Sequence, residues 1–155
     1  MNKRTKKIIK IVISCITSLI LVFVAYLLIC NIVAVRNEKP VRVFGYSYSY
    51  VPTGSMEPTI DAGDSIFFKK TSYDSLEVGD IIVYKSSYGE TKGLYILHRV
   101  VEITQEGLIC KGDANPSVDP EFITEDMFMG KYVKTFNFLN IGKLAYNKDA
   151  IYIIL

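Results

Sequence analysis

The longest apolar stretch of the chain runs from residue 11 to residue 35 and contains no charged side chain. As an α-helix, 25 residues extend about 37 Å, which is enough to cross a hydrocarbon core of about 30 Å. The residues before it include five basic and no acidic side chains: Lys3, Arg4, Lys6, Lys7 and Lys10. Because basic flanks stay in the cytoplasm, we predict a cytoplasmic tail at 1–10, a transmembrane signal anchor at 11–35 and an extracytoplasmic domain at 36–155.

A cleaved signal peptide is the alternative for this N-terminal segment, since it also begins with basic residues followed by apolar ones. Its apolar region would be about 7 to 15 residues long, and the present stretch is considerably longer. The pattern therefore favours an uncleaved anchor and a single-pass protein of the cell membrane.

Beyond residue 36, short runs rich in Val, Ile, Tyr and Phe alternate with turn residues, as expected of strands. One short helical turn is indicated at 124–128. The pattern predicts a mostly β domain with a coiled or barrel-like sheet. The predicted strands are 41–50, 65–69, 80–84, 94–103, 107–111 and 132–138.

An apolar run at 150–155 is too short to span a membrane. Three interpretations are open for it: it lies at the membrane surface, it packs on the core, or it begins a second helix.

Charge and cysteine content exclude several classes of partner. Without the five basic residues of the tail, 13 basic side chains stand against 16 acidic ones, a net charge of −3, so nucleic-acid binding is not expected. Cys15 and Cys30 lie in the apolar stretch, which leaves Cys110 alone in the outer domain. We therefore expect no internal disulfide, no cysteine-based metal site and no cofactor.

The segment around Ser55 interrupts a strand-like run with Gly54 and Pro58. Glycine permits backbone conformations and close approaches that other residues do not, and proline restricts φ, so the segment predicts an exposed bend carrying Ser55. An ordinary turn serine is the alternative.

The single histidine, His98, lies in a predicted strand with apolar neighbours on its face, so a packed core histidine is one interpretation. Two carboxylates, Asp113 and Asp119, follow in a loop that lacks the spacing of an EF-hand calcium site. A serine, a base and a carboxylate orienting the base are the elements of nucleophilic catalysis. Composition alone is weak evidence for that arrangement.

Five segments, taken in order, carry a more specific signal: GSMEPT at 54–59, GDSIFF at 63–68, GDIIVYK at 79–85, HRVVEI at 98–103 and GDANPSVD at 112–119. With the basic N-terminus and the anchor, this order resembles type I signal peptidases over almost the whole chain. Most bacterial members have a lysine base at the position of His98. Histidine resembles the endoplasmic-reticulum-type branch, found also in archaea and in some spore-forming Gram-positive bacteria.

The resemblance implies that Ser55 is the nucleophile, His98 the general base, Asp119 the best candidate for the third catalytic residue and Asp113 a supporting aspartate. One departure from the branch is Ala114, where it usually has asparagine; here Asn115 follows. Which aspartate orients the histidine is therefore open. The resemblance also implies an oxyanion site made of the Ser55 backbone N–H and the Thr53 hydroxyl.

An extended substrate would add as a strand near 48–52 and 95–97. Candidates for a small apolar pocket that selects Ala-like side chains are Val51, Met56, Ile60 and Leu97, with core packing an equal alternative. The expected function is a membrane-bound serine endopeptidase that removes signal peptides from exported preproteins, with the lipid bilayer as its setting and any partner subunits undetermined. The alternatives are a self-cleaving repressor-type serine protease and a membrane-tethered β domain that only binds.

Overall fold

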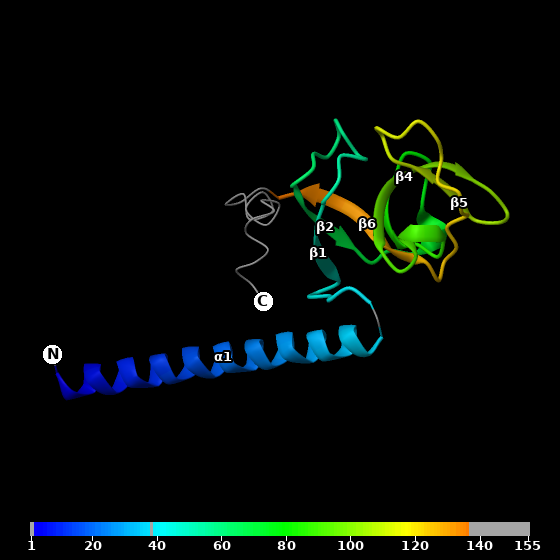
Figure 1. Ribbon diagram of the computed structural model, residues 1–155. Coiled ribbons are helices and arrows are strands. Elements are labelled where there is room, and N and C mark those ends of the chain that lie inside the picture. The colour runs from blue at the N-terminus through cyan, green and yellow to red at the C-terminus, as the bar shows by residue number, and fades with distance from the viewer. Residues whose placement is uncertain (1, 38, 137–155) are drawn as a thin grey trace. The chain divides into compact units, whose positions relative to one another are not determined.

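The computed structural model describes residues 2–37 and 39–136, and the chain divides into two compact units between Val43 and Phe44 (Figure 1). The units are described separately. The predictions for residues 137–138 and 150–155 lie outside the described residues.

The first unit is built on α1 (Lys3–Arg36), a helix of 34 residues. The Asn2 side chain accepts a hydrogen bond from the N–H of Arg4, satisfying a free donor of the first turn. Within the apolar stretch, the Thr17 hydroxyl donates to the carbonyl of Ile13, which satisfies it inside the helix. Among the described residues, α1 is the one helix long and apolar enough to cross a membrane.

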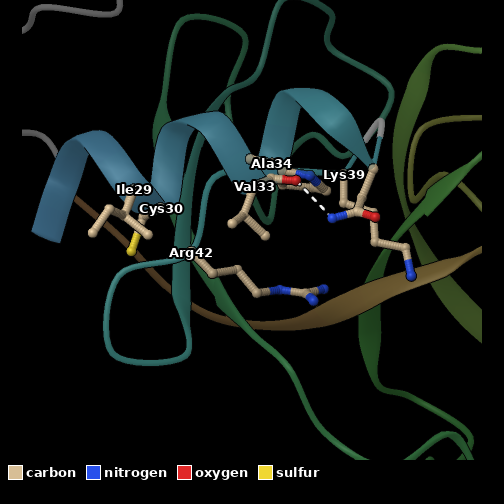
Figure 2. A pocket seen from close by; sticks show the side chains of 8 residues that line it. Ile29, Cys30, Val33, Ala34, Lys39 and Arg42 are labelled. Atoms are coloured by element: carbon tan, nitrogen blue, oxygen red, sulfur yellow. Dashed lines mark hydrogen bonds between the residues drawn. The ribbon is translucent and has the colours of Figure 1, made fainter.

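The C-terminal end of α1 is closed by polar contacts (Figure 2). The Asn37 side chain donates to the carbonyl oxygen of Val33 at 2.7 Å, and the Lys39 N–H donates to that of Ala34 at 3.0 Å. The chain thus turns back on the last helical turn, and Ala34 is buried there. This end of the unit encloses a hollow lined by Ile29, Cys30, Val33, Ala34, Asn37, Lys39, Pro40 and Arg42.

Residues 44–136 of the second unit form a six-stranded antiparallel sheet with the order β1-β2-β6-β3-β4-β5. The predicted mostly β domain is confirmed. The strands are β1 (Tyr46–Tyr50), β2 (Ser65–Lys69), β3 (Ile81–Lys85), β4 (Tyr95–Ile103), β5 (Leu108–Lys111) and β6 (Phe128–Thr135). Two short 3₁₀ turns, η1 (Tyr73–Ser75) and η2 (Gly89–Thr91), lie in the connections before β3 and β4. Irregularities in the β2–β6, β3–β6 and β4–β5 pairings bend and twist the sheet.

Two segments differ from the sequence predictions. β1 begins at Tyr46 rather than residue 41, because Phe44 and Gly45 have φ values of 51° and 82° and turn the chain before the strand. β6 begins at Phe128 rather than residue 132, because Phe128 and Gly130 pair with β3. The short turn predicted at 124–128 is present directly before β6, where the N–H groups of Met127 and Phe128 donate to the carbonyl of Thr124.

Two hydrophobic clusters cover the two faces of β3, whose side chains alternate between them. Ile81 and Val83 belong to the first cluster, and Ile82 and Tyr84 to the second. The first cluster also takes in residues of the segment between β1 and β2, and the second takes in residues that follow β5. Burial of each large apolar side chain contributes about 1.5–3 kcal/mol, so the core holds both connecting segments against β3 and β4.

Candidate active site

The bend carrying Ser55 is a loop closed at its base by backbone hydrogen bonds. The N–H of Val51 donates to Asp64 at 2.9 Å, and the N–H of Gly63 donates to Val51 at 2.8 Å. Met56 and Ile60, 0% and 1% exposed, anchor the loop in the first cluster. Because the Met56 side chain points into the core, the side chain of its neighbour Ser55 lies half-buried at the surface of the loop.

Gly54 faces the end of the exposed Glu57 side chain in this bend. It is absent from the residues with positive φ, so the special backbone conformation that glycine permits is not used here. A Cβ at this position would lie 2.7 Å from Oε1 of Glu57. The missing side chain therefore leaves room for the Glu57 carboxylate, which also accepts a 3.4 Å hydrogen bond from the N–H of Ala62.

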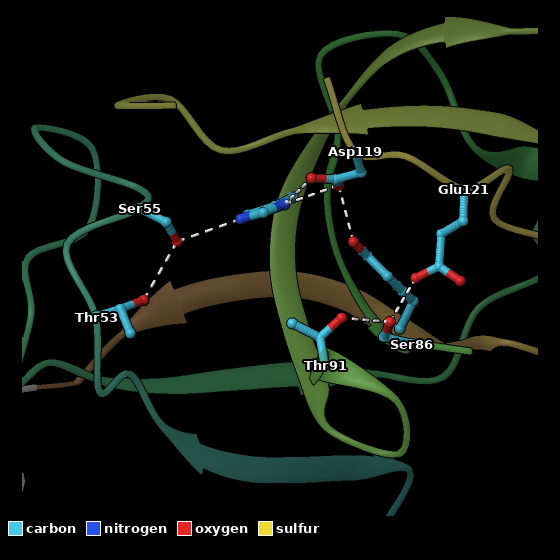
Figure 3. A network of polar contacts seen from close by, with 8 residues as sticks. Thr53, Ser55, Ser86, Thr91, Asp119 and Glu121 are labelled. Carbon is cyan, nitrogen blue, oxygen red and sulfur yellow. Dashed lines mark hydrogen bonds and ion pairs between the residues drawn. The ribbon is translucent and has the colours of Figure 1, made fainter. Parts of the chain in front are cut away.

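His98 lies in β4, paired with Ile82 of β3, and is 7% exposed. Its Nε2 is 3.3 Å from Oγ of Ser55, and its Nδ1 is 2.9 and 2.8 Å from Oδ1 and Oδ2 of Asp119 (Figure 3). An ionised carboxylate can only accept, so Nδ1 carries the proton facing Asp119 and Nε2 of the neutral ring is left as an acceptor for the Ser55 hydroxyl. The structure thus brings these three residues together in the order that serine catalysis requires.

Asp113 lies apart from the His98 ring and binds Arg99 through two hydrogen bonds, Nε to Oδ1 at 2.8 Å and Nη2 to Oδ2 at 2.6 Å. Thr59 donates to the same carboxylate at 2.5 Å. Arg99 holds the pKa of Asp113 below its ordinary value, because its hydrogen bonds favour the ionised form. Of the two aspartates that the sequence left open, Asp119 contacts the histidine and Asp113 joins β4 to the Ser55 loop.

Sequence reasoning missed Tyr84, whose hydroxyl donates to Oδ2 of Asp119 at 2.8 Å. Its ring lies edge-on to the His98 ring with a centroid separation of 6.4 Å. The sequence signal that could have found it is a tyrosine at the end of the otherwise aliphatic run 81–84. A buried phenol hydroxyl needs a hydrogen-bond partner, so such a tyrosine indicates a polar contact in the core.

A second polar network joins the β3–β4 connection to the segment carrying Asp119 (Figure 3). Glu121 accepts from the hydroxyls of Ser86 and Ser87 at 2.5 and 2.7 Å and from the Ser87 N–H at 3.0 Å. The Ser86 hydroxyl also lies 2.8 Å from that of Thr91. These contacts restrain the backbone two residues beyond Asp119.

A cavity of about 430 Å³ adjoins Ser55 and His98. Of the predicted pocket residues, Val51 and Leu97 line it. Met56 and Ile60 do not; they are completely buried in the first cluster, so core packing describes them. The other lining residues are Ser49, Tyr50, Pro52, Thr53, Ile66, Val83, Thr91, Leu94, Tyr95, Ile96 and Asn115.

Two further predicted positions border the site. The Thr53 hydroxyl lies 3.4 Å from Oγ of Ser55. Asn115, one residue beyond the position where the endoplasmic-reticulum-type branch usually has asparagine, lines the cavity. Within residues 2–37 and 39–136, no group of three or more His, Cys, Asp and Glu side chains is placed to hold a metal ion.

Comparison with known proteins identifies the family. The model of the family described as signal peptidase, peptidase S26, matches residues 8–114, which include Ser55, His98 and Asp113. The chain belongs to this family. The predicted membership of the type I signal peptidases is thereby confirmed.

Individual relatives agree with this membership. The chain is 32% identical to signal peptidase I W of Bacillus subtilis (strain 168) over 95 residues, 58% of this chain and 48% of the relative. It is 37% identical to the signal peptidase complex catalytic subunit SEC11 of Colletotrichum graminicola over 81 residues, 49% and 45% of the two chains. With human SEC11C it shares 32% identity over 89 residues, 54% and 41%. The chain spans about half the length of these curated relatives, and the similarity to SEC11 is consistent with the endoplasmic-reticulum-type branch.

Proposed function

We propose that this chain is a membrane-bound serine endopeptidase that removes signal peptides from exported preproteins, cutting after small residues. The observation that carries the proposal is the position of the His98 imidazole, 3.3 Å from Oγ of Ser55 on one side and within 2.9 Å of Asp119 on the other. A membrane-tethered domain that only binds a partner would not need a histidine placed between a serine and a carboxylate. A repressor-type self-cleaving protease uses a lysine base, whereas the residue beside Ser55 is a histidine.

In the proposed reaction, Oγ of Ser55 attacks the substrate carbonyl while Nε2 of His98 takes its proton. The imidazolium then protonates the departing amine as the peptide bond breaks, and water releases the acyl group from Ser55 by the same steps in reverse. Asp119 fixes the tautomer and stabilises the imidazolium. Histidine has an ordinary pKa of about 6.5 and suits this role near neutral pH. Hydrogen bonds at catalytic sites tighten when substrate binds, so 3.3 Å is within reach.

The developing oxyanion needs donors already in position. We assign this role to the Ser55 backbone N–H and the Thr53 hydroxyl. The latter lies 3.4 Å from the attacking oxygen, on the side of the cavity.

An extended substrate can bind along β4. In the described sheet, residues 95–98 of β4 pair with β3, and pairing with β5 begins only at Arg99. The edge at Ile96 and Leu97 can therefore form backbone hydrogen bonds with an added strand, while substrate side chains enter the cavity bounded by Val51 and Leu97. We propose that Val51 and Leu97 limit the side chain that fits directly before the cut.

We place α1 across the cell membrane, with residues 1–10 in the cytoplasm, 11–35 as the anchor and 36–155 as the extracytoplasmic catalytic domain. The apolar length of α1 and its basic start support this orientation. A preprotein held by its own apolar segment in the same bilayer would meet the site at raised effective concentration.

The test incubates the full chain in detergent with a preprotein and identifies the cut by mass spectrometry. Cleavage after a small residue should be lost in Ser55→Ala and in His98→Ala. Ser72→Ala removes an exposed hydroxyl at the start of η1 and should cleave normally. Full cleavage by either site variant would contradict the proposal, and shortening of the enzyme itself would favour the self-cleaving alternative.

A further inference from the structure

Tyr84 extends the line of polar contacts that starts at Ser55. Its side chain is 2% exposed and belongs to the second hydrophobic cluster, yet its hydroxyl reaches Oδ2 of Asp119 at 2.8 Å. The same oxygen lies 2.8 Å from Nδ1 of His98. One carboxylate oxygen thus lies within hydrogen-bonding distance of two donors, one from β3 and one from β4.

From this geometry we propose that Tyr84 is a positioning residue for the reaction, acting through Asp119 on the orientation and basicity of His98. The proposal rests on the function proposed above. Tyr84 touches neither the substrate nor the reacting atoms.

The fold holds Tyr84 and Asp119 firmly in this relationship. Tyr84 pairs with Phe128 of β6 and with Ile96 of β4, so its backbone is fixed on both sides within the sheet. The backbone N–H of Asp119 donates to the carbonyl of Cys110 at 2.8 Å. Asp119 is therefore fixed by its backbone to β5 and by its side chain to β3 and β4.

Tyr84 remains a donor throughout the working pH range. Burial and the neighbouring negative charge of Asp119 raise its pKa well above the ordinary value for tyrosine. Tyr84 accordingly keeps the hydroxyl proton that it donates to Asp119. This contact holds the Asp119 side chain in one rotamer, with its carboxylate facing Nδ1 of His98.

The bond also moderates the effect of Asp119 on the imidazole. A carboxylate that accepts a hydrogen bond from a phenol has part of its negative charge offset. It therefore stabilises the imidazolium less than a carboxylate without that hydrogen bond does. Among the described residues, the titratable and charged groups that act on His98 and its partners are Asp119, Tyr84 and the ion pair of Asp113 and Arg99, together with Glu121, which adds negative charge near Tyr84. The thiol of Cys110 lies behind Asp119, and burial raises its pKa to about 12, so it stays neutral.

The test is Tyr84→Phe, which removes only the hydroxyl. His98 is the single histidine of the chain, so ¹⁵N-histidine labelling of the full protein in detergent reports its titration without overlap. We expect the imidazole titration midpoint to move to higher pH by about half a unit, because Asp119 then stabilises the imidazolium more strongly. The acid limb of kcat/KM should move in the same direction and kcat should fall about tenfold, the loss of a hydrogen bond to a charged group.

Tyr73→Phe is the matched control. It removes another tyrosine hydroxyl, one that donates to the carbonyl of Ile123 at 2.6 Å and borders the same hydrophobic cluster. It should leave the His98 titration unchanged. An unaltered titration in Tyr84→Phe would overturn the proposal, even if the rate fell, since a merely structural role predicts that result.

The two proposals fail differently. If the wild-type chain cuts no preprotein but the His98 titration moves as expected in Tyr84→Phe, the role of Tyr84 is supported and the peptidase function is not. If cleavage depends on Ser55 but the titration stays in place, the peptidase is supported and the role of Tyr84 is refuted.

Discussion

The backbone N–H of Ala114 donates a 2.9 Å hydrogen bond to the carbonyl oxygen of Ser55. This bond joins the loop after β5 to the bend between β1 and β2, about sixty residues earlier. The two segments that carry Ser55 and Asp119 are thereby connected directly, as well as through His98. The relative position of these two segments determines whether Ser55, His98 and Asp119 can form a continuous chain of hydrogen bonds.

Gly112 makes this contact possible, because a Cβ there would lie 2.6 Å from the Ser55 carbonyl oxygen and 2.8 Å from Nδ2 of Asn115. Gly112→Ala should therefore push the loop away from Ser55 and cost about 1–3 kcal/mol of stability, as overpacking does. Cleavage should fall by about tenfold or more, because the reacting groups are displaced. Thermal unfolding and preprotein cleavage measure the two effects, with the exposed Ser117→Ala as a control in the same loop. Normal stability and rate would show that the loop shifts without consequence.

Thr53→Val should lower kcat by about a hundredfold or more, because loss of one oxyanion donor costs about 2.7–4 kcal/mol in the transition state. The variant keeps the shape of the side chain and removes the hydroxyl that lies 3.4 Å from Oγ of Ser55. Thr53→Ser retains a hydroxyl and should keep most of the activity. Single-turnover cleavage rates separate the chemical step from binding, and equal rates for valine and threonine would exclude the proposed role.

Asp113→Asn should destabilise the domain at neutral pH by about 1–2 kcal/mol, the contribution of a partly screened charged hydrogen bond. Arg99 holds the pKa of Asp113 below its ordinary value. The stabilisation is therefore complete above the unfolded-state pKa of about 3.9 and is lost as the pH falls through the lower folded value. Thermal unfolding of both proteins should differ most at pH 5–7, and the difference should shrink below about pH 4.

A control for this titration is Asp74→Asn, which changes an exposed aspartate in η1. It should alter stability little at any of these pH values. A wild-type minus Asp113→Asn difference that stays constant down to pH 2 would contradict the assignment.

Leu97→Ala should widen substrate selection, because Leu97 lines the cavity and packs against the first cluster. We expect substrates with Val or Leu before the cut to gain about tenfold relative to those with Ala, comparable to the discrimination of a methylene or two in an apolar pocket. Competition between matched peptides measures this ratio. Val101→Ala, on the exposed part of β4, is the control and should leave the ratio unchanged. An unchanged ratio in Leu97→Ala would show that Leu97 and its cavity do not select the substrate side chain.

Most helix and strand positions could be predicted from the local pattern of apolar and polar residues. The apolar stretch at 11–35 lies within α1, and most predicted strands match β2, β3, β4 and β5 to within one residue at each end. Helix and strand periodicity are encoded by neighbouring residues, so they can be read without knowledge of the fold. The exceptions, at β1 and β6, are positions where a positive-φ turn or a pairing with a distant strand sets the boundary.

The motif around Ser55 and the single histidine were recognisable in the sequence, since both lie in short segments with a specific order. Met56 and Ile60 were not separable from Val51 and Leu97 by hydrophobicity, because a core and an apolar pocket use the same side chains. Only the packing of the bend shows that Met56 and Ile60 lie wholly in the core, whereas Leu97 and Val51 border the cavity, Val51 while also belonging to the first cluster.

By itself, the sequence determined an apolar helix, a set of β-strands and a serine and a histidine in family motifs. The tertiary structure decided which partner Asp113 and Asp119 each have. His98 and Arg99 are adjacent in β4 and so point to opposite faces, where His98 meets Asp119 and Arg99 meets Asp113. That sorting, and the contact of Tyr84 with Asp119, depend on loops crossing distant strands, which no local pattern encodes.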